Sequence, residues 1–419
     1  MSDEALESLE SLPEDDHRAL AQRLDLLHFQ DEAPGMAFWH PRGWVLYRLL
    51  EETVRAHVRA AGYQEVRTPQ VLRRPIWERS GHWGSFRGSM FAFGAGADEA
   101  ALKPVSCPGH IQIVRRMAPS WRDLPLRIAE LGLVHRDEAS GTLHGLLRMK
   151  QFTQDDGHVF CAPDDVEPEA ERFCRELLAF YRRFGFDDLS LALSLRPPPA
   201  ARLGDDAVWD RAERILEGVV AQLGVPCDVQ PGGGAIYGPK IELLLRDRRG
   251  RAWQCGTLQI DFVMPERFDL RYVDSGGERR HVAILHRALF GSLERFLGML
   301  LEHHGADLPA WLAPEQVAVV PVAAAHAAPA ADACRALAAA GLRARLDADA
   351  ATLSRRVLRA HHDGVPFVVV LGDREVLAGT LAARGRAGTW SGAAGGVIAE
   401  LARRCAPPAE DAWAAGSPT

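Results

Sequence analysis

The chain is poor in lysine, lacks any CxxC pair and contains no long hydrophobic run. Its lysines are Lys103, Lys150 and Lys240, so arginine carries almost all positive charge and its abundance alone does not indicate phosphate recognition. The formal net charge of −7 excludes a protein that is strongly basic overall, but a local basic surface remains compatible with it. Seven scattered cysteines without paired spacing exclude a disulfide framework and are typical of a reducing cytosol.

Signals for secretion or membrane insertion are also missing. The acidic start, MSDEALESLESLPEDDHRAL, has no apolar core of signal-peptide type. No run approaches the roughly 20 apolar residues that cross a bilayer. We therefore expect a soluble, cytoplasmic protein without a membrane partner. Its 419 residues predict two domains.

Hydrophobic periodicity predicts an α+β region in the first three quarters of the chain. Strand candidates follow one another there without regular crossover helices, which favours a mainly antiparallel sheet flanked by helices. The strand candidates are 64–72, 101–107, 127–136, 148–160, 240–247 and 252–264. The helix candidates are 17–30, 43–63, 165–185, 206–224 and 286–305.

The pattern changes after residues 305–316 to alternating strands and helices, which predicts a small α/β unit. A Pro-, Ala- and Gly-rich tail follows and is expected to be disordered. The predicted organisation is an acidic lead and helix at 1–30, a first domain at 31–308, the α/β domain at 309–406 and the tail at 407–419.

The expected strand RMKQFTQDDGHVF, residues 148–160, is unusually polar. Side chains alternate between the two faces of a strand, so one face carries Arg148, Lys150, Phe152, Gln154, Asp156, His158 and Phe160. An exposed edge strand with ordinary salt bridges is the plain alternative. The aromatic residues on the polar face and the apolar flanks instead favour the floor of a binding site, because buried ions need partners or ligands.

Other segments carry weaker signals on their own. Arg136 and Arg148 flank the acidic turn DEASGTLHG and could each offer a planar fork to a phosphate. Cys107 and His110, three residues apart, would make a poor metal-binding pair by themselves. The plain alternative for Cys107 is a buried thiol without a ligand role. ILHRALFGSLERF places His286, Ser292 and Arg295 on or beside a helix, where a surface imidazole is the plain alternative.

These segments together resemble the threonyl-tRNA synthetases, which are class II aminoacyl-tRNA synthetases. The resemblance rests on the ordered segments DHRALAQRLDLLHFQDEAPGMAFWH, GYQEVRTPQ, SGHW, KPVSCPGH, HRDEASGTLHGLLRMKQFTQDDGHVFC, YGPKIEL, WQCGTLQIDF and HRALFGSLERF. The trailing α/β unit resembles their anticodon-binding domain. The resemblance implies ATP-dependent activation of L-threonine to threonyl-adenylate and its transfer to the 3′ end of tRNA-Thr. It also implies a homodimer, because GYQEVRTPQ matches the family's interface motif.

The resemblance implies one zinc ion per chain, bound by Cys107, His158 and His286. Three protein ligands and an open position are typical of a catalytic zinc site. The amino and hydroxyl groups of threonine would make the site five-coordinate, with Asp156 accepting the hydroxyl proton. Valine lacks the hydroxyl and should be strongly rejected, whereas serine keeps both groups and should be activated.

The resemblance also implies where ATP binds. Arg136 would hold the α-phosphate and Arg295 the far end of the triphosphate, with Mg²⁺ offsetting the remaining charge. His82 matches a histidine proposed to assist proton transfer from the tRNA ribose, with a plain loop histidine as the alternative. The other residues expected at the threonine and adenylate sites are Gln154, Tyr237, Gln259, Arg148, Gln254, Lys240 and Ser292.

Two departures from the family pattern affect these expectations. Members usually carry N-terminal ubiquitin-like and editing domains, whereas about 30 residues precede the catalytic core here, so we expect a truncated form that cannot clear seryl-tRNA in cis. The charged family pattern DxRxEK is replaced at residues 349–352, and the basic turn at 383–388 is thinned to ARGRAG. Because phosphate contacts supply much of nucleic-acid affinity, anticodon reading is expected to be weakened.

Two alternative functions therefore stay open. One is a stand-alone threonine-activating paralogue that loads a carrier protein or other acceptor, or acts as a drug-insensitive duplicate. The other is a non-catalytic regulator that binds tRNA or an amino acid. The intact arginines and zinc ligands argue against the regulator, and the zinc ligands disfavour a prolyl enzyme, whose tail domain is similar.

Overall fold

The computed structural model describes residues 12–247 and 249–408, which form two compact units. The larger unit comprises residues 29–36 and 50–299, apart from residue 248. The smaller unit comprises 12–28, 37–49 and 300–408, so N-terminal segments belong with the C-terminal region. The predicted boundaries at 30, 308 and 406 stay a prediction, and the expected disordered tail lies mostly outside the described residues.

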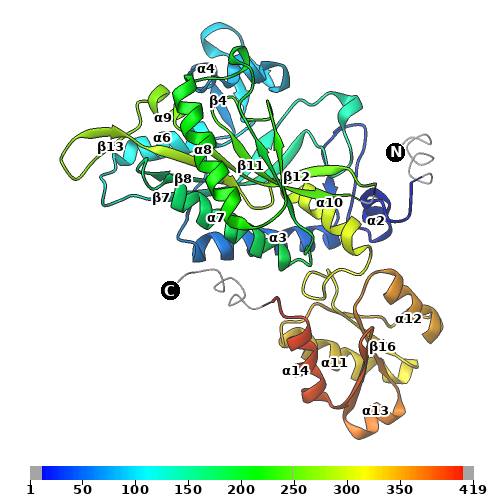
Figure 1. Cartoon of the computed structure of the whole chain (residues 1–419). Coiled ribbons are helices and arrows are strands. Elements are labelled where there is room, and N and C mark those ends of the chain that lie inside the picture. Colours follow the sequence, from blue (N-terminus) through cyan, green and yellow to red (C-terminus); the bar gives the residue numbers. More distant parts are fainter. Residues whose placement is uncertain (1–11, 248, 409–419) are drawn as a thin grey trace. The chain divides into compact units, whose positions relative to one another are not determined.

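An eight-stranded sheet forms the centre of the larger unit (Figure 1). Its order is β10 Cys227–Gln230, β9 Ser190–Ser194, β11 Lys240–Arg246, β12 Ala252–Asp261, β15 Ala283–Ala288, β8 Gln151–Cys161, β7 Leu126–His135 and β3 Gln64–Glu65. The pairs β10–β9 and β3–β7 are parallel and the others are antiparallel. The predicted mainly antiparallel sheet is therefore confirmed.

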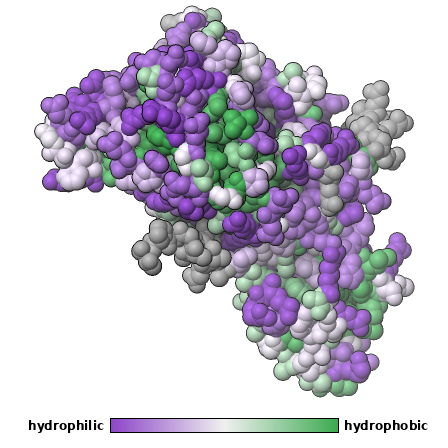
Figure 2. All heavy atoms as spheres, in the orientation of Figure 1, coloured by the Kyte–Doolittle hydropathy of each residue, from purple (hydrophilic) through white to green (hydrophobic). Residues whose placement is uncertain are grey.

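Helices cover this sheet, and the long helices α7 and α8 pack side by side (Figure 1). Asp205 caps α8 by accepting the N–H of Val208, and Gly224 ends it in a left-handed conformation. The helices with residues in the larger unit are α3 Pro41–Ala60, α4 Arg74–Ser80, α5 His82–Phe86, α6 Cys107–Met117, α7 Val166–Arg182, α8 Asp206–Leu223, α9 Val263–Arg267 and α10 Leu293–His304. A recess on this unit gathers apolar residues within a hydrophilic frame (Figure 2).

Short elements complete the larger unit and the N-terminal segments. A three-stranded sheet has the order β4 Val71–Arg73, β6 Ala100–Leu102 and β5 Ala92–Phe93, and two hairpins pair β1 Leu27–His28 with β2 Phe38–Trp39 and β13 Arg271–Val273 with β14 Arg279–His281. The 3-10 helices η1 Arg87–Ser89, η2 Gly96–Asp98, η3 Ser140–Thr142 and η4 Pro199–Ala201 belong to the larger unit, whereas η5 Ala324–His326 belongs to the smaller unit. Among the described residues, no helix is long and apolar enough to cross a membrane.

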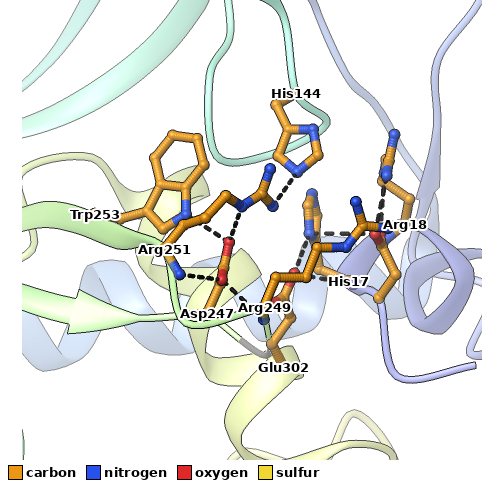
Figure 3. A network of polar contacts seen from close by, with 9 residues as sticks. His17, Arg18, His144, Asp247, Arg249, Arg251, Trp253 and Glu302 are labelled. Carbon is orange, nitrogen blue, oxygen red and sulfur yellow. Dashed lines mark hydrogen bonds and ion pairs between the residues drawn. The ribbon is translucent and has the colours of Figure 1, made fainter. Parts of the chain in front are cut away.

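The smaller unit contains the predicted α/β domain. Its sheet has the order β17 Ala344–Leu346, β16 Val317–Pro321, β18 Phe367–Leu371, β19 Thr380–Gly385 and β20 Gly388–Ala393, and its helices are α2 His17–Arg23, α11 Ala327–Ala339, α12 Leu353–His362, α13 Asp373–Ala378 and α14 Ala394–Arg404. Alternate residues of β16 enter two apolar clusters: Val317 packs with α11 and α14, and Ala318 packs with α12. Buried His17 binds Glu302 through Nδ1 at 2.7 Å (Figure 3). Asp16 caps α2 and binds Arg18.

Several predicted elements are wrong in detail. The helix expected at 17–30 ends at Arg23, and Leu27–His28 form strand β1. The helix expected at 286–305 starts only at Leu293, and His286 lies on strand β15, whose residues are all buried. A short apolar run such as AILHRALF does not distinguish a buried strand from a helix by its periodicity. The strand expected at 101–107 ends at Leu102, and Cys107 begins α6, where Pro108 suits the first helical turn.

Candidate active site and metal centre

A cavity of about 350 Å³ lies in the larger unit, lined by residues from several strands and loops. β8 contributes Phe152 and Gln154, and β12 contributes Thr257 and Gln259. The residues predicted from the sequence that line this cavity are His82, Arg136, Arg148, Gln154, Tyr237, Lys240, Gln254, Gln259, Ser292 and Arg295. The structure therefore brings together, around one space, side chains from distant parts of the sequence.

The remaining predicted residues, Cys107, Asp156, His158 and His286, gather beside this cavity. Tyr237 connects the two groups, because it lines the cavity and its ring stacks on His286 with centroids 4.6 Å apart. The Tyr237 hydroxyl donates a hydrogen bond of 2.6 Å to Oε1 of Gln259. The polar face of β8 thus runs from the cavity floor at Gln154 to this buried cluster.

Two arginines bring positive charge to the cavity. Nε of Arg136 donates to the carbonyl of Pro104 at 3.2 Å, and Arg295 donates to the carbonyls of Leu147 and Gln254 at 2.9 and 2.7 Å. Within the described residues, neither guanidinium forms an ion pair with a carboxylate. Burial and the charge of Arg295 lower the pKa of Arg136, and burial lowers the pKa of Arg295. Both groups stay charged because an arginine is not deprotonated in proteins, so the cavity suits a polyanion.

The other two cations at the cavity are paired. Arg148 forms an ion pair with Glu138 at 2.8 Å, and Lys240 forms one with Glu242 at 2.7 Å. Their charge is partly offset by the protein itself. The cavity therefore contains two arginines that are not paired with a carboxylate, Arg136 and Arg295. Its other two cations, Arg148 and Lys240, would be shared between a ligand and their glutamate partners.

Cys107, His158 and His286 form a buried group with ligand atoms within 4.8 Å of one another. Nε2 of His158 and Nδ1 of His286 face each other at 2.9 Å. Nε2 of His286 lies 2.9 Å from Oδ2 of Asp261, and an ionised carboxylate only accepts, so this nitrogen carries the proton. The lone pair of His286 Nδ1 then points into the cluster, as metal binding requires.

The chemistry of this donor set fits zinc. Burial raises the pKa of the Cys107 thiol well above its usual value, and the nearby Asp156 and Asp261 raise it further. A thiolate at this position therefore needs a cation beside it. Burial also lowers the pKa of His158, which keeps the imidazole neutral and able to donate a lone pair. One thiolate and two neutral imidazoles are ligands of catalytic zinc sites.

Asp156 and His82 lie at the edges of this group. An oxygen of Asp156 lies 3.7 Å from His158 Nε2, and another accepts the backbone N–H of Ser106 at 3.2 Å. His82 is buried, and its Nδ1 lies 2.8 Å from the hydroxyl of Ser80. Burial, with the positive charge of Arg136, lowers the pKa of His82 to about 3. The imidazole is therefore neutral in the free protein.

The opposite face of β8 has a role that the sequence pattern did not predict. Asp155 accepts the backbone N–H groups of Leu289, Phe290 and Gly291 at 2.5, 3.1 and 3.0 Å. These residues lead directly into Ser292 and α10, which carries Arg295. Burial raises the pKa of Asp155 to about 6, although its hydrogen bonds and Arg287 oppose that shift. The doublet Asp155–Asp156 was the available signal, since its members must point to opposite faces of a strand.

The Asp155 partner Arg287 explains a glycine on the same face. A Cβ atom at Gly157 would lie 2.3 Å from Nε of Arg287, so only glycine allows the guanidinium to pack against this strand. Nothing in the local sequence indicates this contact, because it joins strands that are 130 residues apart in the chain.

An aromatic and polar network holds the loop at the cavity rim (Figure 3). Asp247 accepts hydrogen bonds from Nε of Arg251 at 2.6 Å and from Nε1 of Trp253 at 2.9 Å. Arg251 also contacts Nε2 of His144 at 2.9 Å, and the His144 ring stacks parallel to Trp253. His144 belongs to the loop that brings Leu147 and Arg148 to the cavity, so the network fixes that loop against β12.

Comparisons with known proteins agree with the resemblance drawn from the sequence. The family model for the tRNA synthetase class II core domain (G, H, P, S and T) matches residues 92–304, and the anticodon binding domain model matches residues 316–392. Threonine–tRNA ligase from Dichelobacter nodosus is 46% identical over 373 residues, covering 89% of this chain and 58% of that protein. Threonine–tRNA ligase from Paraburkholderia phymatum is 46% identical over 386 residues, covering 92% of this chain and 60% of that protein.

A solved structure shows the same likeness. The crystal structure of the RNA binding domain of threonyl-tRNA synthetase from Cryptosporidium parvum Iowa II superposes with a TM-score of 0.90 at 34% identity. The match covers 94% of this chain and 100% of that one. The chain spans about three fifths of the length of the curated relatives named above.

Proposed function

Because the chain belongs to the threonyl-tRNA synthetase family of class II aminoacyl-tRNA synthetases, we propose that it activates L-threonine with ATP and transfers it to the 3′ end of tRNA-Thr. The observation that carries the proposal is the meeting of two different sites on one sheet. A buried Cys–His–His cluster suits the amino acid, and the adjoining cavity with Arg136 and Arg295 suits a triphosphate.

In the first step, a carboxylate oxygen of threonine bonds to the α-phosphorus of ATP, and pyrophosphate leaves. This step brings two anions together, so positive charge must offset their repulsion and stabilise the developing charge. We assign Arg136 to the α-phosphate and Arg295 to the far end of the triphosphate, with Mg²⁺ bound to ATP. The remaining adenylate contacts are assigned to Arg148, Gln254, Lys240 and Ser292.

The amino acid site is assigned to the metal cluster and the residues around it. A zinc ion held by Cys107, His158 and His286 would have coordination positions open for both the amino and the hydroxyl group of threonine. Asp156 would accept the hydroxyl proton. Gln154, Gln259 and Tyr237 would complete the pocket; the bond from the Tyr237 hydroxyl to Gln259 Oε1 leaves the amide N–H groups free to donate.

In the transfer step, a ribose hydroxyl of tRNA attacks the anhydride carbonyl and AMP leaves. We assign His82 to accept the hydroxyl proton. Its neutral state supports this role, but a pKa of about 3 makes it a weak base in the free protein. The adjacent phosphate of the adenylate would raise that pKa, because a nearby negative charge favours the protonated imidazole.

The smaller unit supports a second candidate for the acceptor. Arg359 is paired with Asp347 and Asp349 at 2.7 Å each, so its charge is offset within the unit. This pairing weakens the case for tight anticodon contacts. The alternative is an enzyme that passes activated threonine to a carrier protein or another acceptor.

We further propose a homodimer in the cytoplasm. The segment GYQEVRTPQ, which matches the family interface motif, contains β3 at the outer edge of the eight-stranded sheet. An edge strand can support an interface with a second copy. Light scattering of the purified chain tests this directly, since a monomer at micromolar concentration would contradict it. A cytoplasmic location follows from the proposed use of ATP and tRNA.

Two assays separate the proposed activities. Threonine-dependent exchange of pyrophosphate into ATP should occur with the wild-type chain and fall by about 10²–10³-fold in Arg136→Ala. No exchange by the wild-type chain would favour the regulator. Charging of tRNA-Thr, compared with loading of a carrier protein, then identifies the acceptor. Efficient tRNA charging supports the main proposal, whereas exchange with transfer to the carrier alone supports the second candidate.

A further inference from the structure

A buried polar network lies behind the metal cluster, and no role has been assigned to it. Lys103 and His110 are 0% exposed, and Glu130 and Thr68 are 3% and 5% exposed. Nζ of Lys103 donates to Glu130 Oε1 at 2.8 Å and to the Thr68 hydroxyl at 2.9 Å. Burying a lysine and a glutamate is costly unless each is fully hydrogen-bonded, so their presence beside a metal centre calls for a function.

Glu130 is held as an anion in this network. It accepts the backbone N–H of Thr68 at 3.0 Å and the Thr68 hydroxyl at 2.8 Å, in addition to Lys103. Burial alone would raise its pKa, but hydrogen bonds from His110, Lys103 and Thr68 lower the pKa of Glu130 to about 2. An ionised carboxylate accepts hydrogen bonds and donates none.

The network reaches the metal cluster through His110. Nε2 of His110 lies 3.2 Å from Glu130 Oε2, and its Nδ1 lies 2.8 Å from Nδ1 of His158. Because Glu130 only accepts, a neutral His110 carries its proton on Nε2 and presents a lone pair at Nδ1. His158 must then donate from Nδ1, which leaves the lone pair of its Nε2 directed at Cys107 and His286.

We propose that Lys103, Glu130 and His110 form a positioning relay that fixes the His158 tautomer and ring orientation for metal binding. This inference rests on the zinc site of the proposed function. Asp261 does the same for His286 by direct contact. A carboxylate thus orients each imidazole ligand. Asp261 contacts His286 directly, and Glu130 acts on His158 through His110.

The relay also explains the tetrapeptide CPGH. Cys107 supplies the thiolate, and His110 lies one helical turn later on α6. A Cβ atom at Gly109 would lie 2.7 Å from Thr68, so glycine allows α6 to approach the residue that also binds Glu130. The segment therefore couples a metal ligand to the relay within a single turn of helix.

Two substitutions of His110 separate a positioning role from general packing. His110→Asn places an amide oxygen near the position of Nδ1, so it can still accept from His158. His110→Phe fills similar space and cannot accept. We expect the full-length Phe variant to release zinc to a chelator about 10–100 times faster than wild type, and the Asn variant to stay within about threefold.

The cobalt-substituted proteins provide a second readout. The Phe variant should shift or weaken the visible ligand-field bands of bound Co²⁺, because the His158 ring is no longer held, whereas the Asn variant should keep the wild-type spectrum. His57→Phe removes another buried histidine and serves as the control, with unchanged zinc release. If the Phe variant does not fold, the double variant Lys103→Met/Glu130→Gln removes both charges together. The amide introduced at position 130 can donate as well as accept, so it no longer fixes the His110 proton on Nε2. Zinc release should therefore still be faster than in wild type.

The outcomes are distinguishable. Wild-type protein that binds no zinc would overturn the proposed zinc site and the relay together. Zinc-bound wild type with the same release rate and cobalt spectrum in the Phe variant would overturn the relay alone. Equal effects of the Asn and Phe variants would also overturn it, because they would indicate packing rather than proton placement.

Discussion

Arg136 and Arg295 of the cavity are held in the opposite way to Arg345 and Arg359 of the smaller unit. Arg136 and Arg295 bind backbone carbonyls, which orient the guanidinium without cancelling its charge. Arg359 binds two carboxylates, and Arg345 binds Glu315 and Asp363 at 3.0 and 3.1 Å. The net charge of −7 therefore says little about where an anion can bind, because what matters is which cations are not paired with a carboxylate of the protein.

The largest expected effect is on stability and concerns the buried ion pair of Lys103 with Glu130. Lys103→Met leaves Glu130 as an unpaired buried anion, which should lower the free energy of unfolding by about 3–5 kcal/mol. Arg403→Ala removes a pair on the surface and should leave the unfolding midpoint unchanged. Urea unfolding of both variants tests this. Equal losses of unfolding free energy would show that burial does not decide how much an ion pair contributes to stability.

The next effect concerns the uncompensated arginines. Arg136→Ala and Arg295→Ala should each reduce threonine-dependent ATP–pyrophosphate exchange by about 10²–10³-fold, because each removes a fixed charge from the proposed triphosphate site. Arg359→Ala should leave exchange within about twofold of wild type. A larger loss in the Arg359 variant than in the cavity variants would break the comparison.

Acid should expose the contribution of the Glu130 carboxylate. Its pKa is about 2 in the folded protein and 4.5 in the reference state, so its stabilisation is complete above pH 4.5 and lost as the pH falls towards 2. At 1.36 kcal/mol per unit, the shift corresponds to roughly 3 kcal/mol. Unfolding free energies from pH 5 to pH 2.5 should fall less steeply in Lys103→Met/Glu130→Gln than in wild type. Parallel curves would contradict the assignment.

The smallest effect concerns the cations of the smaller unit. Asp349→Ala frees part of the Arg359 charge and should tighten tRNA binding about two- to threefold at low salt, with no difference at high salt. Asp332→Ala serves as the control, because it changes the net charge by the same amount. Asp332 pairs with Arg335 on α11, whereas Arg359 lies on α12. The same gain in both variants would mean that net charge alone is responsible.

The sequence predicted the parts of the site that lie on periodic elements or match a motif. The polar face of residues 148–160 pointed to a binding floor, and Gln154 does line the cavity. The sequence pattern did not predict that His286 lies on a strand, because the periodicity of a short buried apolar run does not distinguish a strand from a helix. The local sequence indicates only a weak metal pair of His110 with Cys107, because the actual partners of His110, Glu130 and His158, are 20 and 48 residues away. Such pairings depend on sheet order, which periodicity does not specify.

The most direct test of the central claim is pyrophosphate exchange by the zinc-loaded chain with threonine, serine and valine in turn. A metal-centred pocket that reads the hydroxyl predicts exchange with threonine and rejection of valine by about 10⁴-fold or more. Serine should lose only about 10–200-fold, as expected for one missing methyl group. Valine activation within tenfold of threonine, or no threonine-dependent exchange when zinc is bound, would contradict the account.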